Sequence, residues 1–134
     1  MVSIPACFSE SYAEARPLVL DGGEYIFQAR CSSCHTIGGG DAIGPDLAGV
    51  TTRRGRAWLA RYVQVPDAVL AEGDPVATAL FQQYNTVRMP NLRLGSADVA
   101  AVVDYLAAQD TAAKNQPDAH HHHHADEKGH GGKN

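Results

Sequence analysis

Apolar residues recur at the three- and four-residue spacing of an α-helix in four stretches of the chain. No stretch alternates apolar and polar residues as a half-buried strand would. The helices that this pattern predicts are residues 21–31, 57–65, 74–84 and 96–108. We therefore expect an all-α fold of four to five helices.

Prolines, glycines and one serine indicate where these helices begin and end. Pro75 suits the first turn of the third helix, and Pro66 is expected to end the second. Ser96 is expected to cap the fourth helix. Residues 38–52 and 85–94 are expected to be loops. The buried stripe predicted for the fourth helix consists of Val99, Val102, Val103 and Leu106.

The same pattern divides the chain into an arm, one domain and a tail. A length of 134 residues suits a single domain. Residues 1–20 lack periodicity and contain two prolines, which predicts an extended N-terminal arm. Residues 21–108 hold all the predicted helices. Residues 109–134 have almost no apolar side chains, so we expect a disordered, His-rich tail that cannot offset the entropy of ordering.

Charge and composition argue against nucleic acid as a partner and against a transmembrane segment. A net charge of −4 and a pI near 5.9 argue against nucleic acid, which rewards clusters of Lys and Arg. No stretch approaches the roughly 18 apolar residues of a membrane span. The first twenty residues contain Glu10, Glu14 and Arg16 where a signal peptide is continuously apolar, so we expect a cytoplasmic chain or one whose export signal has been removed.

Residues 31–35 have the form C-x-x-C-H. The thiols of Cys31 and Cys34 are spaced to reach the two vinyl groups of one haem, and His35 follows to bind the iron. A redox C-x-x-C needs a βαβ context that is absent, and a zinc site needs two further ligands, for which only the distant Cys7 and the tail histidines are available. A covalent haem would also complete a core that contains few aromatic residues.

Low-spin haem iron takes a sixth ligand, and a thioether in that position raises the reduction potential. The chain has two methionines, Met1 and Met89, and Met1 is terminal. Met89 precedes Pro90 in a predicted loop, where a residue that only fills the core is a poor fit. Met89 is therefore the expected axial ligand.

With these motifs, residues 22–108 resemble a class I cytochrome c. The resemblance implies the cytochrome c fold, with helices wrapped around one covalently bound haem c. It also implies that Gly23 and Phe27 of the first helix pack against Tyr105 of the last helix.

The resemblance extends to a Gly-Pro-x-Leu segment, which is residues 44–47 here. It implies that the carbonyl of Pro45 accepts the Nδ1 proton of His35 and fixes the ring. It further implies that Arg53, eight residues after this proline, neutralises a haem propionate. Arg54 is the neighbouring candidate, and a solvated surface arginine is the alternative.

A finer similarity is to cytochrome c domains associated with Sco-type copper-delivery proteins, which assist assembly of the copper centre of cytochrome oxidase. The residues that carry it are 44–51, Arg53, Arg54, Trp58, Leu59, Asp74, Pro75 and 89–92. This similarity implies a monomer with redox protein partners: a respiratory complex, an oxidase or a Sco-type protein. The copper-binding Sco domain itself is not in this chain.

The function that these resemblances imply is one-electron transfer by a carrier that is not an enzyme. An enzyme would need a labile Met89 and a distal His or Arg, yet His35 is the only histidine before the tail. The alternative is a haem-based reductant that serves copper delivery and binds metal through its tail. Attachment of haem c occurs on the exported side of the membrane, so the resemblance implies a periplasmic protein whose signal peptide has been removed.

Two features outside the predicted domain remain open. The tail carries histidines that bind copper, nickel or zinc readily as neutral imidazoles: His120, His121, His122, His123, His124 and His130. They are equally compatible with a purification tag and with a native metal-binding tail. Cys7 follows a short segment that resembles the end of a lipoprotein signal, and the alternative is a free thiol.

Overall fold

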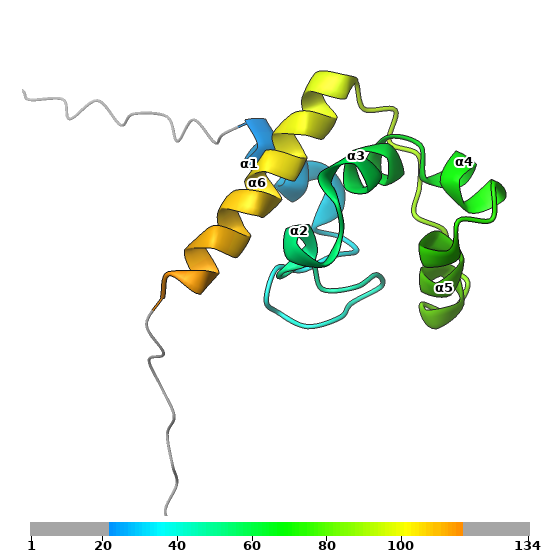
Figure 1. The fold of residues 1–134 in the computed structure, drawn as a ribbon, viewed down its shortest axis with the longest axis horizontal. Helices are drawn as coiled ribbons and strands as arrows, with labels where there is room; N and C mark the ends of the chain where they lie inside the picture. The colour runs from blue at the N-terminus through cyan, green and yellow to red at the C-terminus, as the bar shows by residue number, and fades with distance from the viewer. Residues whose placement is uncertain (1–21, 117–134) are drawn as a thin grey trace, which may run out of the picture.

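The computed structural model describes residues 22–116, and within them it is entirely helical, with six α-helices, one π-helical turn and no strand (Figure 1). The predicted arm, Cys7 and the tail histidines lie outside these residues. The elements are α1 Gly22–Ile26, η1 Phe27–Cys31, α2 Val50–Arg53, α3 Arg56–Gln64, α4 Pro66–Ala71, α5 Pro75–Gln83 and α6 Ser96–Lys114. The all-α prediction is confirmed.

The first helix crosses α6 at very close range. A Cβ added to Gly23 would lie 2.1 Å from the carbonyl oxygen of Ala101, so only glycine permits this approach. One turn later, the ring centroids of Phe27 and Tyr105 are 5.8 Å apart and the rings are tilted by 44°. The predicted packing of the first helix against the last is therefore present.

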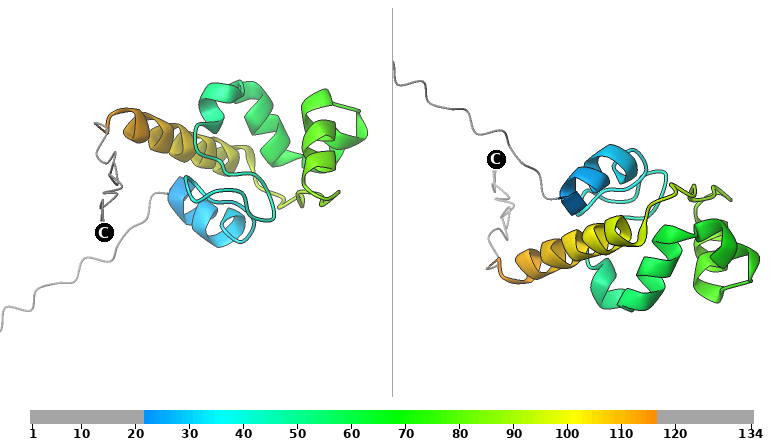
Figure 2. Two further views of the ribbon diagram at one scale, coloured as in Figure 1. Left: turned by 90° about the horizontal axis from the view of Figure 1, so that it is seen from below. Right: turned by 90° about the horizontal axis from the view of Figure 1, so that it is seen from above.

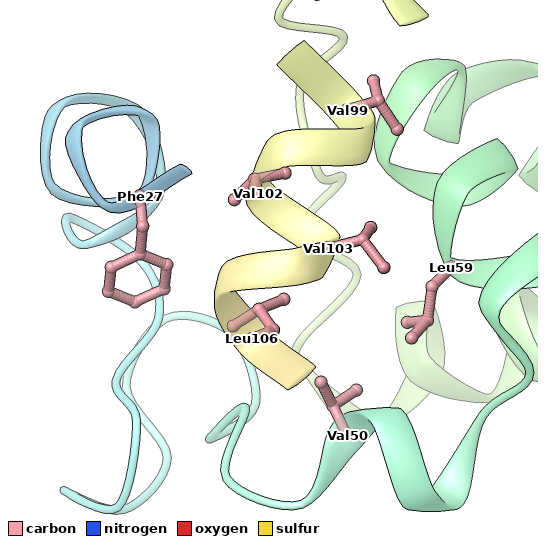
Figure 3. Close-up of a cluster of buried hydrophobic side chains, with 7 residues drawn as sticks. All are labelled: Phe27, Val50, Leu59, Val99, Val102, Val103 and Leu106. Atoms are coloured by element: carbon pink, nitrogen blue, oxygen red, sulfur yellow. The ribbon is translucent and has the colours of Figure 1, made fainter. Parts of the chain in front are cut away.

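The core is built around α6. Figure 3 shows this helix between Phe27 of η1 on one side and Val50 of α2 and Leu59 of α3 on the other. The core cluster consists of Phe27, Val50, Leu59, Val99, Val102, Val103 and Leu106. The predicted stripe of α6 is confirmed in full, because all four of its members are buried.

Two short helices depart from the expected pattern. The loop predicted to run to residue 52 ends earlier, since α2 begins at Val50. Helix α3 ends at Gln64, just before Pro66 as predicted, but a further helix, α4, follows. Pro66 occupies its first turn. Its fixed φ and missing N–H suit that position as well as they suit a stop. Elements of four and six residues are too short for hydrophobic periodicity to reveal.

The last helix begins and ends differently from the prediction. Gly95 occupies the N-cap position and Ser96 is the first helical residue, with no side-chain cap. The helix continues past residue 108 to Lys114, so the beginning of the predicted disordered tail is helical. The reason is tertiary: the Asp110 carboxylate is 5% exposed and accepts hydrogen bonds from the backbone N–H groups of Gly49 and Thr51. These contacts fix the final turns of α6 against α2.

The helices α4 and α5 lie at one end of the molecule, beyond α3 and away from α1 (Figures 1 and 2). The predicted start of α5 is confirmed, since Asp74 caps it by accepting the amide of Ala77 at 2.9 Å. Residues 84–95 then connect α5 to α6. None of the helices in residues 22–116 combines the length and apolarity needed to cross a membrane.

Candidate haem-binding site

The C-x-x-C-H motif sits in a tight turn at the end of a π-helical segment. The amide of Ser32 donates to the carbonyl of Phe27, an i to i+5 bond of 2.9 Å that inserts one extra residue into the helix. The amides of Cys34 and His35 both donate to the carbonyl of Cys31, at 3.1 and 3.0 Å. The two thiols and the imidazole are thereby gathered within one turn of the chain.

The imidazole of His35 is held on two sides. Its Nδ1 lies 2.8 Å from the carbonyl oxygen of Pro45, which is the contact that the family resemblance implies. A carbonyl can only accept, so Nδ1 carries a proton, and in the neutral imidazole this tautomer leaves the lone pair on Nε2. A Cβ on Gly44 would lie 2.6 Å from Cε1 of the ring. Gly44 therefore allows the backbone to pack directly against the imidazole, a role that the sequence analysis missed.

The loop that carries Pro45 is folded around one carboxylate. Asp46 accepts the backbone N–H groups of Gly38, Gly40 and Ala48, each at 2.8 Å. These hydrogen bonds, led by that from Ala48, hold the pKa of Asp46 below its ordinary value. The loop thus has a defined shape although residues 32–49 contain no helix.

A single cavity of about 510 Å³ brings the predicted site residues together. Cys31, Cys34, His35 and Met89 all line it, as do Pro45 and Arg53. The volume lies within the range of sites for small molecules and cofactors. The apolar part of the wall is continuous with the core and includes Phe27, Val50, Leu59, Val102 and Leu106.

The two arginines considered for the propionates have different surroundings. Arg53 donates to the backbone carbonyls of Ala48 and Asp46, so its guanidinium helps to hold the loop. Arg54 lies over the ring of Trp58, with its Cζ 5.9 Å from the ring centroid. Both arginines line the cavity.

Trp58 and Tyr62 form a stacked pair in the cavity wall, with ring centroids 4.8 Å apart. The indole Nε1 of Trp58 donates to Asp74 at 3.1 Å, so this N–H is already paired within the protein. The hydrogen bond from the Ala77 amide is the largest of the contacts that hold the pKa of Asp74 below its ordinary value. Burial raises the pKa of Tyr62, which keeps its hydroxyl protonated at neutral pH.

The segment that carries Met89 has an unusual backbone. Asn85, Thr86 and Arg93 have φ values of 57°, 58° and 55°, a left-handed region that is strained for a β-branched residue such as Thr86. After Met89, the carbonyl of Leu92 accepts a hydrogen bond of 3.3 Å from Arg30. The sequence predicted this loop but not the hydrogen bond from Arg30 to Leu92, which joins residues 62 positions apart.

The donor set and its surroundings fit a covalently attached haem. Cys31 and Cys34 are half-buried and are not joined to each other, so both sulfurs are available to bond a haem. The imidazole presents Nε2, and the thioether reaches the same cavity from a different segment. Among residues 22–116 no cluster of three or more His, Cys, Asp or Glu side chains could hold a separate metal ion.

Comparison with known proteins agrees with this site. The sequence profile of the cytochrome c family matches residues 20–110. A cytochrome c-553-like protein from Synechocystis sp. is 37% identical over 67 residues, which are 48% of this chain and 64% of that protein. The match thus spans less than two thirds of the length of this curated relative.

Two solved structures are also similar to this chain. The cytochrome c domain of the pp3183 protein from Pseudomonas putida is 52% identical, with a TM-score of 0.62 over 69% of this chain and 91% of that one. Cytochrome c from Rhodothermus marinus is 28% identical, with a TM-score of 0.64 over 68% of this chain and 76% of that one. Since the family profile covers more than half of the sequence, this protein belongs to the cytochrome c family.

Proposed function

We propose that this protein carries single electrons between protein partners through one haem c that is bonded to Cys31 and Cys34 and ligated by His35 and Met89. The observation that carries the proposal is the single cavity that all four side chains line, although Met89 is 54 residues from His35 in the chain. Membership of the cytochrome c family supports the same function.

The residues of the chain have distinct tasks in this proposal. When bound, haem c supplies an iron atom that gains and loses one electron. The hydrogen bond from Nδ1 to Pro45 makes His35 a stronger ligand and fixes its ring. A thioether from Met89 favours the reduced iron relative to other common ligands, and the apolar wall limits access of water. Arg53 and Arg54 are the proposed partners of the acidic substituents of the haem edge.

The absorption spectrum of the purified holoprotein tests this ligand pair. We expect a low-spin spectrum in both oxidation states and, in the ferric state, a weak near-infrared band from Met-to-iron charge transfer. Met89→Leu keeps a side chain of similar size but removes the sulfur, so the band should disappear and small ligands should bind the ferric iron. A high-spin wild-type spectrum without the band would contradict the proposal and favour an enzyme with an open iron position.

The cavity rim offers a surface for transient docking. Ile43 is 53% exposed and Val87 is 49% exposed, and both line the cavity. Exposed apolar side chains beside a redox centre suit a weak redox encounter, which buries less than roughly 1,200 Å². We therefore propose that partners approach at this rim.

The proposed setting is respiratory or oxidase assembly, with a Sco-type protein as one partner and a location on the exported side of the membrane. This part of the proposal is supported by the similarity of residues 44–51 and 89–92 to cytochrome c domains associated with Sco proteins. The alternative use of the haem as a reductant for copper delivery requires the same partner.

Stopped-flow mixing of the ferrous protein with a Sco-type protein that holds Cu(II) tests the setting. One electron would pass from iron to copper, giving ferric iron and Cu(I), with a rate that depends on partner concentration. Val87→Glu should slow the reaction, whereas Tyr25→Glu should not, because Tyr25 is exposed but does not line the cavity. Absence of any reaction would contradict the Sco setting and leave the electron carrier proposal standing.

A further inference from the structure

Two segments from different parts of the chain form much of the cavity wall. One is the loop of residues 36–49 that follows His35, and the other runs from α5 to Met89. Among the residues that the structure describes, one hydrogen bond joins these two segments: the Tyr84 hydroxyl donates to Oδ2 of Asp41 at 2.9 Å. The two residues are 43 positions apart, and both line the cavity.

Asp41 is oriented by its own loop. Its second carboxylate oxygen, Oδ1, accepts the backbone N–H of Asp46 at 2.8 Å. The side chain of Asp46 in turn binds three backbone amides of the same loop. Because the loop already fixes the carboxylate, little conformational entropy is lost when Tyr84 binds it.

Tyr84 stands where the Met89 segment leaves its helix. It is the C-cap residue of α5, and the two residues that follow, Asn85 and Thr86, are both left-handed. Consecutive left-handed residues persist only where surrounding contacts hold the chain in place. Downstream of Met89, the hydrogen bond from Arg30 provides such a contact. Upstream, the amides of Thr86 and Val87 bond only within the turn, at 2.9 and 3.1 Å, and the bond to Asp41 is the contact that joins this turn to the loop after His35.

We propose that the hydrogen bond between Tyr84 and Asp41 is a clasp that positions Met89, by holding the Met89 segment against the loop that follows His35. This inference rests on the proposed function, in which Met89 and His35 ligate the same iron. Tyr84 and Asp41 are positioning residues, because they act on the thioether through the backbone of the segment. Opening the clasp favours the state in which Met89 has left the iron.

Competition by imidazole for the ferric iron of the holoprotein measures this effect. Tyr84→Phe removes the hydroxyl and keeps the ring in the cavity wall. A hydrogen bond of this kind contributes a factor of roughly three to ten in an equilibrium. We therefore expect the variant to bind imidazole about three to ten times more tightly than the wild type, with loss of the near-infrared Met band at lower imidazole concentration. Tyr25→Phe is the matched control, since Tyr25 is 62% exposed and does not line the cavity.

A double-mutant cycle with Asp41→Ala tests whether the effect of the Tyr84 hydroxyl on imidazole affinity depends on Asp41. In the Asp41→Ala background, Tyr84→Phe should change imidazole affinity less than twofold. The clasp is wrong if Tyr84→Phe matches the Tyr25→Phe control, or if its full effect persists without Asp41. A wild type that lacks the Met band contradicts the proposed function itself, whereas a wild type with the band and an unaffected Tyr84→Phe contradicts the clasp alone.

Discussion

Replacement of Asp110 by asparagine is expected to destabilise the domain substantially although the residue does not line the cavity. Oδ1 of Asp110 accepts the amide of Gly49 at 2.6 Å. Oδ2 accepts the amide of Thr51 at 2.9 Å and the Thr51 hydroxyl at 2.6 Å. One side chain thus anchors the end of α6 to the start of α2, which carries the cavity residues Val50 and Arg53.

The magnitude follows from the donors that lose their partner. Asparagine keeps one acceptor oxygen and turns an NH₂ group toward the other backbone N–H, which is then buried without a partner at a cost of about 1–3 kcal/mol. The remaining hydrogen bonds lose the strength that the charge gave them, which is about 1 kcal/mol more. Because asparagine has the same shape, no cavity term is added. We expect a loss of about 3 kcal/mol, or roughly 12–24 °C in Tm for a domain of this size.

Thermal and guanidinium unfolding of the holoprotein, followed by far-ultraviolet circular dichroism, measures this loss. The matched control is Asp104→Asn, the same change on the same helix at a side chain that is 66% exposed and paired with Arg56. A surface pair of this kind contributes about 1 kcal/mol or less. The reasoning is refuted if the two variants differ by less than about 1 kcal/mol in their free energy of unfolding.

Three further predictions concern pH and two glycines. Burial acts to raise the pKa of Asp110, but its hydrogen bonds outweigh burial and hold the pKa below the ordinary 3.8. The stabilisation from Asp110 is therefore complete at about pH 5 and above, and it is lost as the pH falls through the lower folded-state pKa. The stability gap between wild type and Asp110→Asn should narrow in urea titrations at acidic pH, and a constant gap would contradict this. Gly23→Ala should lower the free energy of unfolding by about 3 kcal/mol in the same assay, because its Cβ would lie 2.1 Å from a backbone oxygen of α6. Gly22→Ala is the control, and it should be neutral or stabilising because the space around Gly22 is open. Gly44→Ala should push the imidazole of His35 away from its position and increase the high-spin fraction of the ferric absorption spectrum at neutral pH, so an unchanged spectrum would argue against the packing of this glycine on the ring.

Local patterns in the sequence were sufficient for the helical class, the buried stripe of α6 and the identity of the candidate ligands. Periodicity reveals a buried face wherever a helix is long enough to repeat it, and the C-x-x-C-H spacing encodes its chemistry within five residues. Elimination then indicated Met89, since only one other methionine exists. These inferences needed no knowledge of how distant segments meet.

Contacts between segments that are distant in the sequence were decided only by the tertiary structure. Pro66 was expected to end one helix, and only the folded chain shows that it also begins the next, six-residue helix. In the sequence, Asp110 is one polar residue in a weakly apolar stretch. Its structural role becomes apparent only in the folded chain, where it accepts the amides of Gly49 and Thr51. The hydrogen bond from Tyr84 to Asp41 joins residues 43 positions apart, and no periodic pattern in the sequence predicts it. Contacts of this kind are set by the geometry of the folded chain, because each partner becomes recognisable only when the other lies beside it.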